Sequence, residues 1–189
     1  MARVLVPLAP GFEELEAVTI IDLLRRAGIE VVSAGLSPGP VKGARGTVLL
    51  PDATLEDALK HDYDMVALPG GMPGAKNLDE DPRIKALLVD MAAHGKYTAA
   101  ICAAPIVLAS AGLLAGKCAT SYPGFLDKMD LADVTCSAEP VVLDGKVITS
   151  RGPGTAMDFA LQLIETLLGT PRRDEVEAGL QRPEKCRSA

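Results

Sequence analysis

The stretch KYTAAICAAPIVLASAGLLAG, residues 96–116, places a cysteine where an apolar strand runs into an apolar helix. A buried cysteine often serves only as a small hydrophobic side chain. A cysteine at the start of a helix instead lies at the positive end of the helix dipole, which favours the thiolate and lowers the thiol pKa. Cys102 is therefore a candidate nucleophile, and core packing stays open as the alternative.

The residues after Cys102 favour a sharp turn. Ala103 and Ala104 are small, and Pro105 falls in the first helical turn, where a missing N–H removes no hydrogen bond. The arrangement is similar to the nucleophile elbow of hydrolases, with alanines where those enzymes have glycines. We expect such an elbow to lower the pKa of the Cys102 thiol, and each unit of pKa corresponds to about 1.36 kcal/mol.

Other polar or small residues follow neighbouring predicted strands. Three acidic residues follow the first strand, namely Glu13, Glu14 and Glu16, and the strand that ends at Leu68 is followed by Gly70 and Gly71. Ligands of open α/β sheets bind outside the carboxyl ends of the strands. We therefore expect these segments and Cys102 to share one crevice.

The sequence alone does not decide which of the three acids faces that crevice. Glu16 lies just inside the first predicted helix, where the dipole favours a carboxylate, and Glu13 and Glu14 are expected to be solvated. The backbone N–H groups of Gly71 and Ala103 are candidate donors to an oxyanion. A Gly-Gly pair also commonly just ends a strand.

The remaining residues of chemical interest offer less. His61 and His94 fall at predicted helix ends and are expected on the surface, so a cysteine protease triad lacks its base. Two arginines, Arg45 and Arg151, are candidate anion ligands. The four cysteines have no CxxC spacing and form no metal-ligand cluster with the two histidines; Cys118 and Cys136 are expected to be structural thiols and Cys186 an exposed one.

Composition limits the class of protein. Of the 189 residues, 48% are hydrophobic but only 3% are aromatic, which indicates an aliphatic α/β core. The formal net charge of -6 argues against stable nucleic-acid binding. The N-terminus, with Pro7, Pro10 and three glutamates, resembles neither a signal peptide nor a membrane span. Free thiols favour a cytoplasmic protein without membrane contact.

Apolar strand patterns alternate with helical patterns along the chain, so we expect a mostly parallel sheet covered on both faces. We expect one domain over residues 1–189, with a short charged tail from about residue 171. The predicted strands are 3–8, 29–36, 46–52, 63–71, 97–101 and a hairpin over 141–150, and the predicted helices are 13–28, 54–61, 82–95, 103–111 and 154–169.

Several motifs together resemble one family. VLVPLAPGFEELEAVTIIDLLRRAG, PDATLEDA, YDMVALPGGMPGAKNL, AAICAAP and ITSRGPGTAMDFAL look like the ThiJ/PfpI superfamily, in the branch that contains Parkinson disease protein 7 and the bacterial YajL proteins. The resemblance runs from Val4 to about Gly169. It implies a flavodoxin-like three-layer sandwich, a homodimer, an oxidisable elbow cysteine at Cys102, a protonated acid at Glu16 and backbone donors at Gly71 and Ala103.

The resemblance also implies activity without added cofactor. Proteins of this branch are described as glyoxalases, as deglycases that reverse early glyoxal or methylglyoxal adducts on proteins and nucleotides, and as redox-responsive chaperones. We therefore expect an enzyme for reactive dicarbonyls, in which Cys102 attacks and Glu16 moves the proton. A redox sensor whose cysteine becomes a sulfinic acid is the alternative. A peptidase is disfavoured because Ala103 stands where peptidase-like members carry histidine, and a passive dimeric binding module leaves the elbow unexplained.

The chain departs from the branch in two places. Tyr122 and Pro123 stand where the branch has a His-Pro pair, so any role of that histidine passes to a phenol or is lost. The residues LQRPEKCRSA replace the C-terminal helix that helps to cover the site in close relatives. Gly70, Tyr122, Pro123, Arg45 and Arg151 complete the residues that we expect to line the site.

Overall fold

A seven-stranded sheet with strand order β10-β11-β7-β6-β1-β2-β5 organises the chain. The computed structural model describes residues 1–131 and 133–182. The strands of this sheet are β1 (Arg3–Leu8), β2 (Glu30–Gly35), β5 (Ala53–Thr54), β6 (Met65–Leu68), β7 (Tyr97–Ile101), β10 (Val141–Asp144) and β11 (Val147–Ser150). Two small sheets pair β3 (Val41–Lys42) with β4 (Val48–Leu49), and β8 (Cys118–Ala119) with β9 (Thr135–Cys136).

The main sheet is parallel except at one edge. β1 pairs in parallel with β2 and β6, and β7 with β6 and β11. Only β10 is antiparallel, because it forms a hairpin with β11 around Asp144 and Gly145, as the Asp-Gly pair predicts. The carboxyl ends of β1, β6, β7 and β11 therefore meet at the same edge, and the predicted flavodoxin-like α/β class is confirmed.

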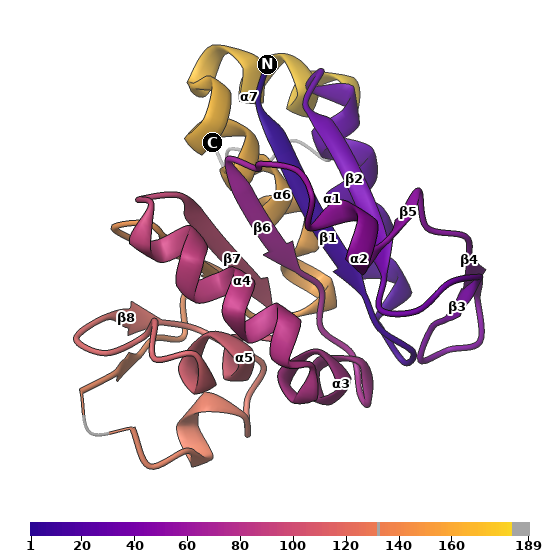
Figure 1. Cartoon of the computed structure of the whole chain (residues 1–189). Coiled ribbons are helices and arrows are strands. Elements are labelled where there is room, and N and C mark those ends of the chain that lie inside the picture. The colour runs from indigo at the N-terminus through magenta and orange to yellow at the C-terminus, as the bar shows by residue number, and fades with distance from the viewer. Residues whose placement is uncertain (132, 183–189) are drawn as a thin grey trace, which may run out of the picture.

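Helices cover both faces of the sheet (Figure 1). The helices are α1 (Glu14–Arg26), α2 (Leu55–Ala58), α3 (Gly74–Glu80), α4 (Pro82–Ala93), α5 (Pro105–Ser110), α6 (Ala156–Leu168) and α7 (Thr170–Gly179), with 3-10 turns η1 (Leu126–Lys128) and η2 (Pro153–Thr155). Figure 1 shows α4 in front of β6 and β7, with α1 and α6 packed together behind the sheet.

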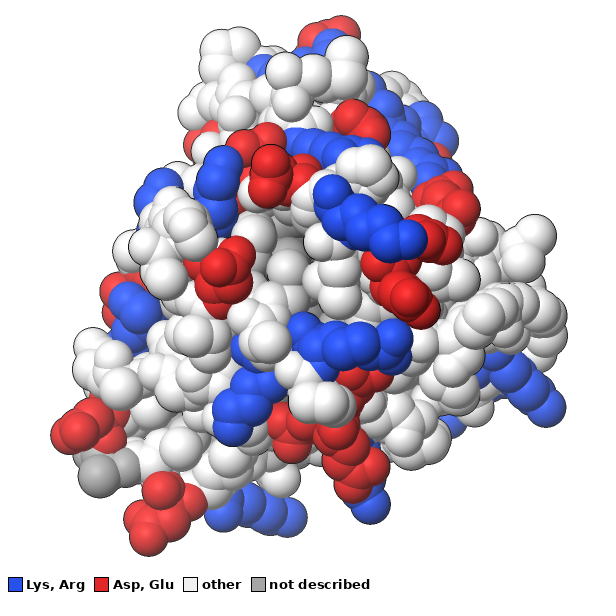
Figure 2. Space-filling view, viewed as in Figure 1, with Lys and Arg blue, Asp and Glu red and all other residues white. Residues whose placement is uncertain are grey.

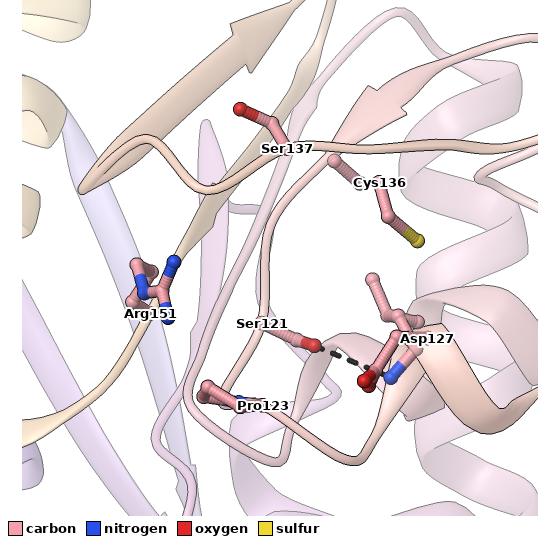
Figure 3. Close-up of a pocket in the computed structure, with 8 residues that line it drawn as sticks. Ser121, Pro123, Asp127, Cys136, Ser137 and Arg151 are labelled. Carbon is pink, nitrogen blue, oxygen red and sulfur yellow. Dashed lines mark hydrogen bonds between the residues drawn. The ribbon is translucent and has the colours of Figure 1, made fainter.

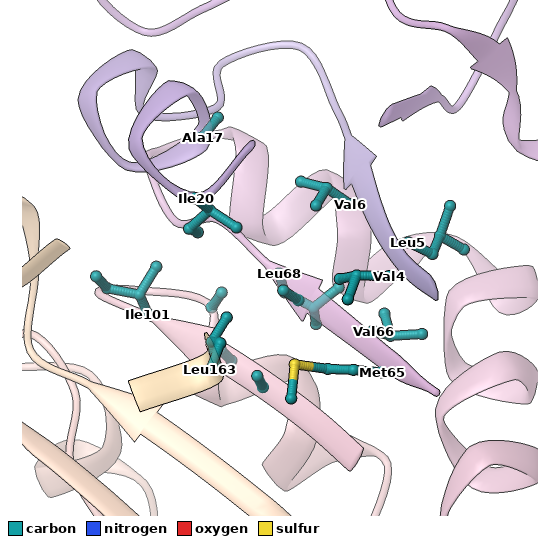
Figure 4. Close-up of a cluster of buried hydrophobic side chains, with 14 of the residues drawn as sticks. Val4, Leu5, Val6, Ala17, Ile20, Met65, Val66, Leu68, Ile101 and Leu163 are labelled. Atoms are coloured by element: carbon teal, nitrogen blue, oxygen red, sulfur yellow. The ribbon is translucent and has the colours of Figure 1, made fainter. Parts of the chain in front are cut away.

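The aliphatic core explains why α1 holds its position. Val4, Leu5 and Val6 are completely buried although they point alternately to the two faces of β1, which is the pattern of a strand covered on both sides. Figure 4 shows Ile20 of α1 and Leu163 of α6 together on one side of the sheet. Both are completely buried, and this packing fixes the first turn of α1 at the edge where the strands end.

Two predicted helix starts are confirmed by their caps. Thr54 accepts a hydrogen bond from the Asp57 amide, and its hydroxyl donates to the Asp57 carboxylate. Asp81 accepts a hydrogen bond from the Arg83 amide, and Pro82 is the first residue of α4. The helix predicted over 103–111 is shorter, because the turn that contains Cys102 extends to residue 104.

The strand predicted over 46–52 is wrong as a single element. Val48 and Leu49 belong to the separate β3–β4 hairpin, and Ala53 and Thr54 form the edge strand of the main sheet. Pro51 lies between them, and a proline has no N–H to continue a ladder of hydrogen bonds. The hairpin is thus free to bend away from the sheet and reach the edge where α1 begins.

The end of the chain differs in character from the rest, as its charge indicates. The predicted charged tail from about residue 171 begins as helix α7, in which only Val176 is buried, and Cys186 lies outside the described residues. Figure 2 shows basic and acidic side chains intermixed on the face that it draws. Within the described part of the chain, no helix has the length and apolar character needed to span a membrane.

Candidate active site

The turn at Cys102 is a strained strand-to-helix elbow. Cys102 has a φ of 64°, a left-handed conformation that non-glycine residues seldom adopt. Two hydrogen bonds hold it there, one from the Cys102 amide to the Ser150 carbonyl at 3.0 Å and one from the Tyr122 amide to the Cys102 carbonyl at 2.8 Å. The end of β11 and the Tyr122 loop therefore fix the direction in which the thiol points.

Glu16 is the acid that faces the thiol. Its side chain is completely buried, and its Oε2 accepts a hydrogen bond of 2.8 Å from the Gly70 amide. The carboxyl lies close enough to the Cys102 thiol for each group to shift the pKa of the other, and its Oε1 is buried with no hydrogen-bond partner among the described residues. The first turn of α1 thus delivers one acid to the elbow.

Two glycines make this close approach possible. A Cβ on Gly70 would lie 2.6 Å from the Cβ of Cys102 and 2.9 Å from Oε2 of Glu16. Gly71 has a φ of 87°, which favours glycine, and its amide, together with that of Ala103, acts to lower the pKa of the Cys102 thiol. The Gly-Gly pair therefore does more than end a strand, because it admits both the acid and the thiol.

The electrostatics of the pair are unusual for both groups. Burial raises the pKa of Glu16 to about 7, against a lowering effect of the Gly70 amide. Burial, followed by the charge of the Glu16 carboxylate, raises the pKa of Cys102 to about 12, although the amides of Gly71 and Ala103 act in the opposite direction. Our expectation of a lowered thiol pKa is thus wrong, because burial alone already acts against ionisation of the thiol and the Glu16 carboxylate adds to it. In their effect on the Cys102 pKa, desolvation and a like charge outweigh the dipole of the short helix α5.

The two groups are consequently coupled. Two negative charges in one buried site repel each other, so the pair resists losing its second proton. When the Glu16 carboxyl is protonated, burial still raises the Cys102 pKa but the contribution of the Glu16 charge disappears, and the neutral carboxyl has an O–H that can donate a hydrogen bond. The arrangement can therefore hold a thiolate beside a neutral acid, which is a nucleophile with a proton donor in contact.

A cavity of about 290 Å³ opens onto this pair. It is lined by Glu13, Ala44, Arg45, Gly71, Met72, Cys102, Ala103, Tyr122, Phe125 and Pro153. Of the residues that we expected at the site, Arg45 and Tyr122 thus line the cavity, and Gly70 lies beneath it against Glu16. Pro123 and Arg151 do not line the cavity of Cys102. They lie in an adjoining hollow, because the loop after Tyr122 turns away from the elbow.

Glu14 is not simply solvated, contrary to our expectation. Oε1 of Glu14 accepts hydrogen bonds from the amides of Arg45, at 2.7 Å, and Thr47, at 3.2 Å. These bonds help to lower the pKa of Glu14 and fasten the β3–β4 loop to the start of α1. Glu13 is half-buried and lines the cavity. Glu14 therefore positions the loop that carries Arg45.

Several residues that line the cavity were not predicted from the sequence. Phe125 packs edge-on against Tyr122, with 6.3 Å between ring centroids and an interplanar angle of 80°. The signal was available, since few residues of this chain are aromatic and these two are three positions apart. Met72, Ala44 and Pro153 carried no signal of chemistry in the sequence.

The other candidate residues lie elsewhere. His61 and His94 are exposed, as expected, and line a separate hollow. Cys118 is half-buried, whereas Cys136 is exposed and so does not fill the core. Across residues 1–131 and 133–182, no group of three or more His, Cys, Asp or Glu side chains is placed to hold a metal ion.

Known proteins are similar to this chain in sequence and in architecture. The family model described as the DJ-1/PfpI family matches residues 2–166. A zebrafish (Danio rerio) relative, Parkinson disease protein 7 homolog, is 46% identical over 181 residues, covering 94% of this chain and 96% of the relative. The Caenorhabditis elegans glutathione-independent glyoxalase DJR-1.2 is 39% identical over 164 residues, covering 87% of each chain.

A solved structure agrees with these relationships. The oxidized DJ-1 of Toxoplasma gondii superimposes with a TM-score of 0.92 at 40% sequence identity, covering 97% of this chain and all (100%) of that chain. The family match spans most of the described residues and includes the elbow, the Gly-Gly pair and the first turn of α1. The chain therefore belongs to the DJ-1/PfpI family.

Proposed function

We propose that this protein is a cofactor-independent cysteine enzyme that acts on reactive dicarbonyls. The observation that carries the proposal is the completely buried Glu16 carboxyl, which lies with Cys102 against Gly70 and whose pKa is raised to about 7. The reaction is the conversion of methylglyoxal to lactate. Release of early glyoxal adducts from proteins or nucleotides begins with the same attack on a carbonyl-derived carbon.

The first step forms a bond between Sγ of Cys102 and the aldehyde carbon of methylglyoxal. The carbonyl electron pair moves to oxygen, and in this proposal the amides of Gly71 and Ala103, which already act to lower the thiol pKa, stabilise that alkoxide. Transfer of the Glu16 proton to the alkoxide gives a hemithioacetal and leaves a carboxylate.

The second step moves hydrogen within the substrate. The Glu16 carboxylate removes the proton from the former aldehyde carbon, and an enediol forms. A proton returned to the neighbouring carbon gives a lactoyl thioester. The first carbon is thereby oxidised and the second reduced, so no external electron acceptor is needed. Water then adds its hydroxyl to the acyl carbon and its proton to Glu16, and the C–S bond breaks. This restores the Cys102 thiolate and the protonated Glu16, and the lactic acid that is released loses its proton to solvent as lactate.

The relatives support this reaction type. The Caenorhabditis elegans protein that resembles this chain is named a glutathione-independent glyoxalase. A protein thiol that takes the place of glutathione must be reachable by a small aldehyde. Cys102, which is 9% exposed at the floor of the cavity, satisfies that condition.

We further propose a cytoplasmic homodimer built from one domain over residues 1–189. Large apolar side chains are exposed on α1 and on the β3–β4 hairpin, namely Leu15, Val18, Val48 and Leu50, and a dimer would cover such a patch. A monomeric mass in sedimentation at micromolar concentration would exclude the dimer.

A second candidate function, redox sensing by a chaperone, uses the same residues. The structurally similar Toxoplasma gondii DJ-1 was solved in an oxidized form. Two molecules of peroxide would convert the Cys102 thiolate to a sulfinate with release of two waters, and the protonated Glu16 could donate a hydrogen bond to it.

Substitution of the nucleophile and of the acid tests the enzymatic proposal. We expect Cys102→Ser to abolish lactate formation from methylglyoxal. Glu16→Gln should reduce kcat by roughly 10²- to 10⁴-fold, the usual contribution of general acid–base catalysis. Chiral lactate analysis of stopped reactions measures both. Cys136→Ser, at an exposed thiol, is the matched control and should keep full activity. Substantial lactate from the Cys102 variant would contradict the mechanism.

The raised pKa of Glu16 should be visible in stability once the thiol is absent. In a Cys102→Ser background, the native state keeps the Glu16 proton up to about pH 7, whereas the unfolded state loses it near pH 4.5. The free energy of unfolding should therefore fall between these pH values, by about 3 kcal/mol at pH 8. Adding Glu16→Gln should remove that decline, as urea titrations at pH 5 and pH 8 would show. Adding Glu56→Gln, at an exposed glutamate, should not.

Intact mass after mild peroxide treatment tests the sensor. If the elbow stabilises a thiolate, a gain of two oxygens should be confined to Cys102 and absent from Cys102→Ser. Peptide mapping locates the modification. Equal oxidation of Cys102, Cys118 and Cys136 would show that the elbow gives no special reactivity and would count against sensing.

A further inference from the structure

The cavity above Cys102 continues into a second hollow. This hollow, of about 330 Å³, is lined by Tyr122, Pro123, Arg151, Gly152, Pro153, Gly154 and Thr155. Tyr122 and Pro153 line both spaces, so their side chains form the shared rim. The space available to a substrate therefore extends beyond what methylglyoxal would fill.

Gly152 lies between the Cys102 sulfur and this second hollow, which it lines. A Cβ at Gly152 would lie 3.1 Å from Cδ2 of the Tyr122 ring and 4.0 Å from Sγ of Cys102. The glycine backbone therefore passes close to the nucleophile, and Arg151 is the next residue toward β11. A substrate attached to Cys102 can extend along Gly152, beside the Tyr122 ring, toward the Arg151 side chain.

Arg151 is the one charged residue that lines the second hollow. Its Nη1 donates a hydrogen bond of 2.9 Å to the Ala138 carbonyl, and its amide donates to the Pro140 carbonyl at 3.3 Å. These bonds hold the arginine in place. No carboxylate within the described residues forms an ion pair with its guanidinium, which leaves donors of the fork for a ligand.

The charges around the path favour an anion at Arg151 over other positions. Glu13 and Arg45 both line the cavity of Cys102, where their opposite charges offset each other. A third hollow, of about 150 Å³, adjoins the far side of Arg151 and is shown in Figure 3. Asp127 lines that hollow and accepts a hydrogen bond of 2.6 Å from the Gly124 amide. A second anion beside Asp127 would be repelled, so an anion is best placed between Cys102 and Arg151.

We infer that the site prefers 2-oxoaldehydes that carry a carboxylate at the other end of the molecule, with Arg151 as the residue that binds this carboxylate. The inference rests on the proposed function and specifies its substrate class. A single guanidinium fork matches a planar carboxylate. The Tyr122 ring gives the intervening carbons an apolar wall in place of a second charge.

A matched pair of substrates tests the inference. The probes are 4,5-dioxopentanoate, which has a carboxylate two carbons from the dicarbonyl, and its methyl ester, which lacks the charge. The native protein should have the higher kcat/KM with the acid. Arg151→Gln, which keeps a donor for the Ala138 carbonyl, should lower kcat/KM for the acid about tenfold, the usual scale for a hydrogen bond to a charged group. It should change kcat/KM for the ester less than twofold.

Two controls separate the possible failures. Arg45→Gln should change the ratio of kcat/KM for the acid to kcat/KM for the ester much less than Arg151→Gln does. The preference for the acid should also decline as salt rises from about 50 to about 500 mM, because salt screens charges that lie roughly 10 Å apart or closer. Turnover of the ester with an unchanged ratio in Arg151→Gln would overturn the inference and leave the proposed function standing. Turnover of neither probe nor methylglyoxal would overturn both.

Discussion

The repulsion between two buried acids, the Glu16 carboxyl and the Cys102 thiol, is the constraint on which the rest of this site depends. Either group alone in this position would be an acid made weaker by burial. Together they share a site in which one negative charge is tolerated and a second is opposed. A nucleophile and a proton donor are therefore obtained from the same ionisation, since the charge can rest on sulfur while the proton rests on the carboxyl.

The fold supplies the conditions for this coupling. Parallel strands end at a common edge, and the packing of α1 against α6 brings the first turn of α1 to that edge. Gly70 removes the side chain that would separate the two acids, and the left-handed turn at Cys102 directs the sulfur at them. Glu14 then fastens the β3–β4 loop as one wall of the cavity. Strain at the elbow is compensated by the hydrogen bonds to Ser150 and from Tyr122.

Much of the fold follows from local sequence features. Alternation of apolar strands and amphipathic helices, the Asp81-Pro82 cap and the Asp-Gly hairpin act over a few residues, so the parallel sheet and most element types could be predicted. The position of Pro51 also held the signal that strand 46–52 is interrupted. The resemblance in motifs singled out Glu16, whereas spacing alone left three acids open.

The remaining features depend on tertiary contacts that no single stretch encodes. The role of Glu14, which fastens a loop to the start of α1, depends on backbone amides of a hairpin about thirty residues later in the chain. The direction in which the Cys102 pKa shifts depends on burial and on a carboxylate from α1. These two effects outweigh that of the helix dipole, which is the only one that could be predicted from the sequence around Cys102. The separation of Arg151 and Pro123 from the cavity of Cys102 depends on how the loop after Tyr122 turns.

A pH titration of thiolate absorbance near the ultraviolet edge tests the shared proton most directly. The Cys102 signal is the absorbance of the native protein minus that of Cys102→Ser. The same subtraction should be made for Glu16→Gln, with the double variant Glu16→Gln and Cys102→Ser as its reference. If Glu16 keeps its proton while Cys102 ionises, the thiolate should form near or below neutral pH. Its midpoint should then change by less than about one pH unit in Glu16→Gln, because no charge is removed. A thiolate that is absent below about pH 10 and whose midpoint falls by several pH units in Glu16→Gln would contradict the shared proton, because the charge would then rest on the carboxylate.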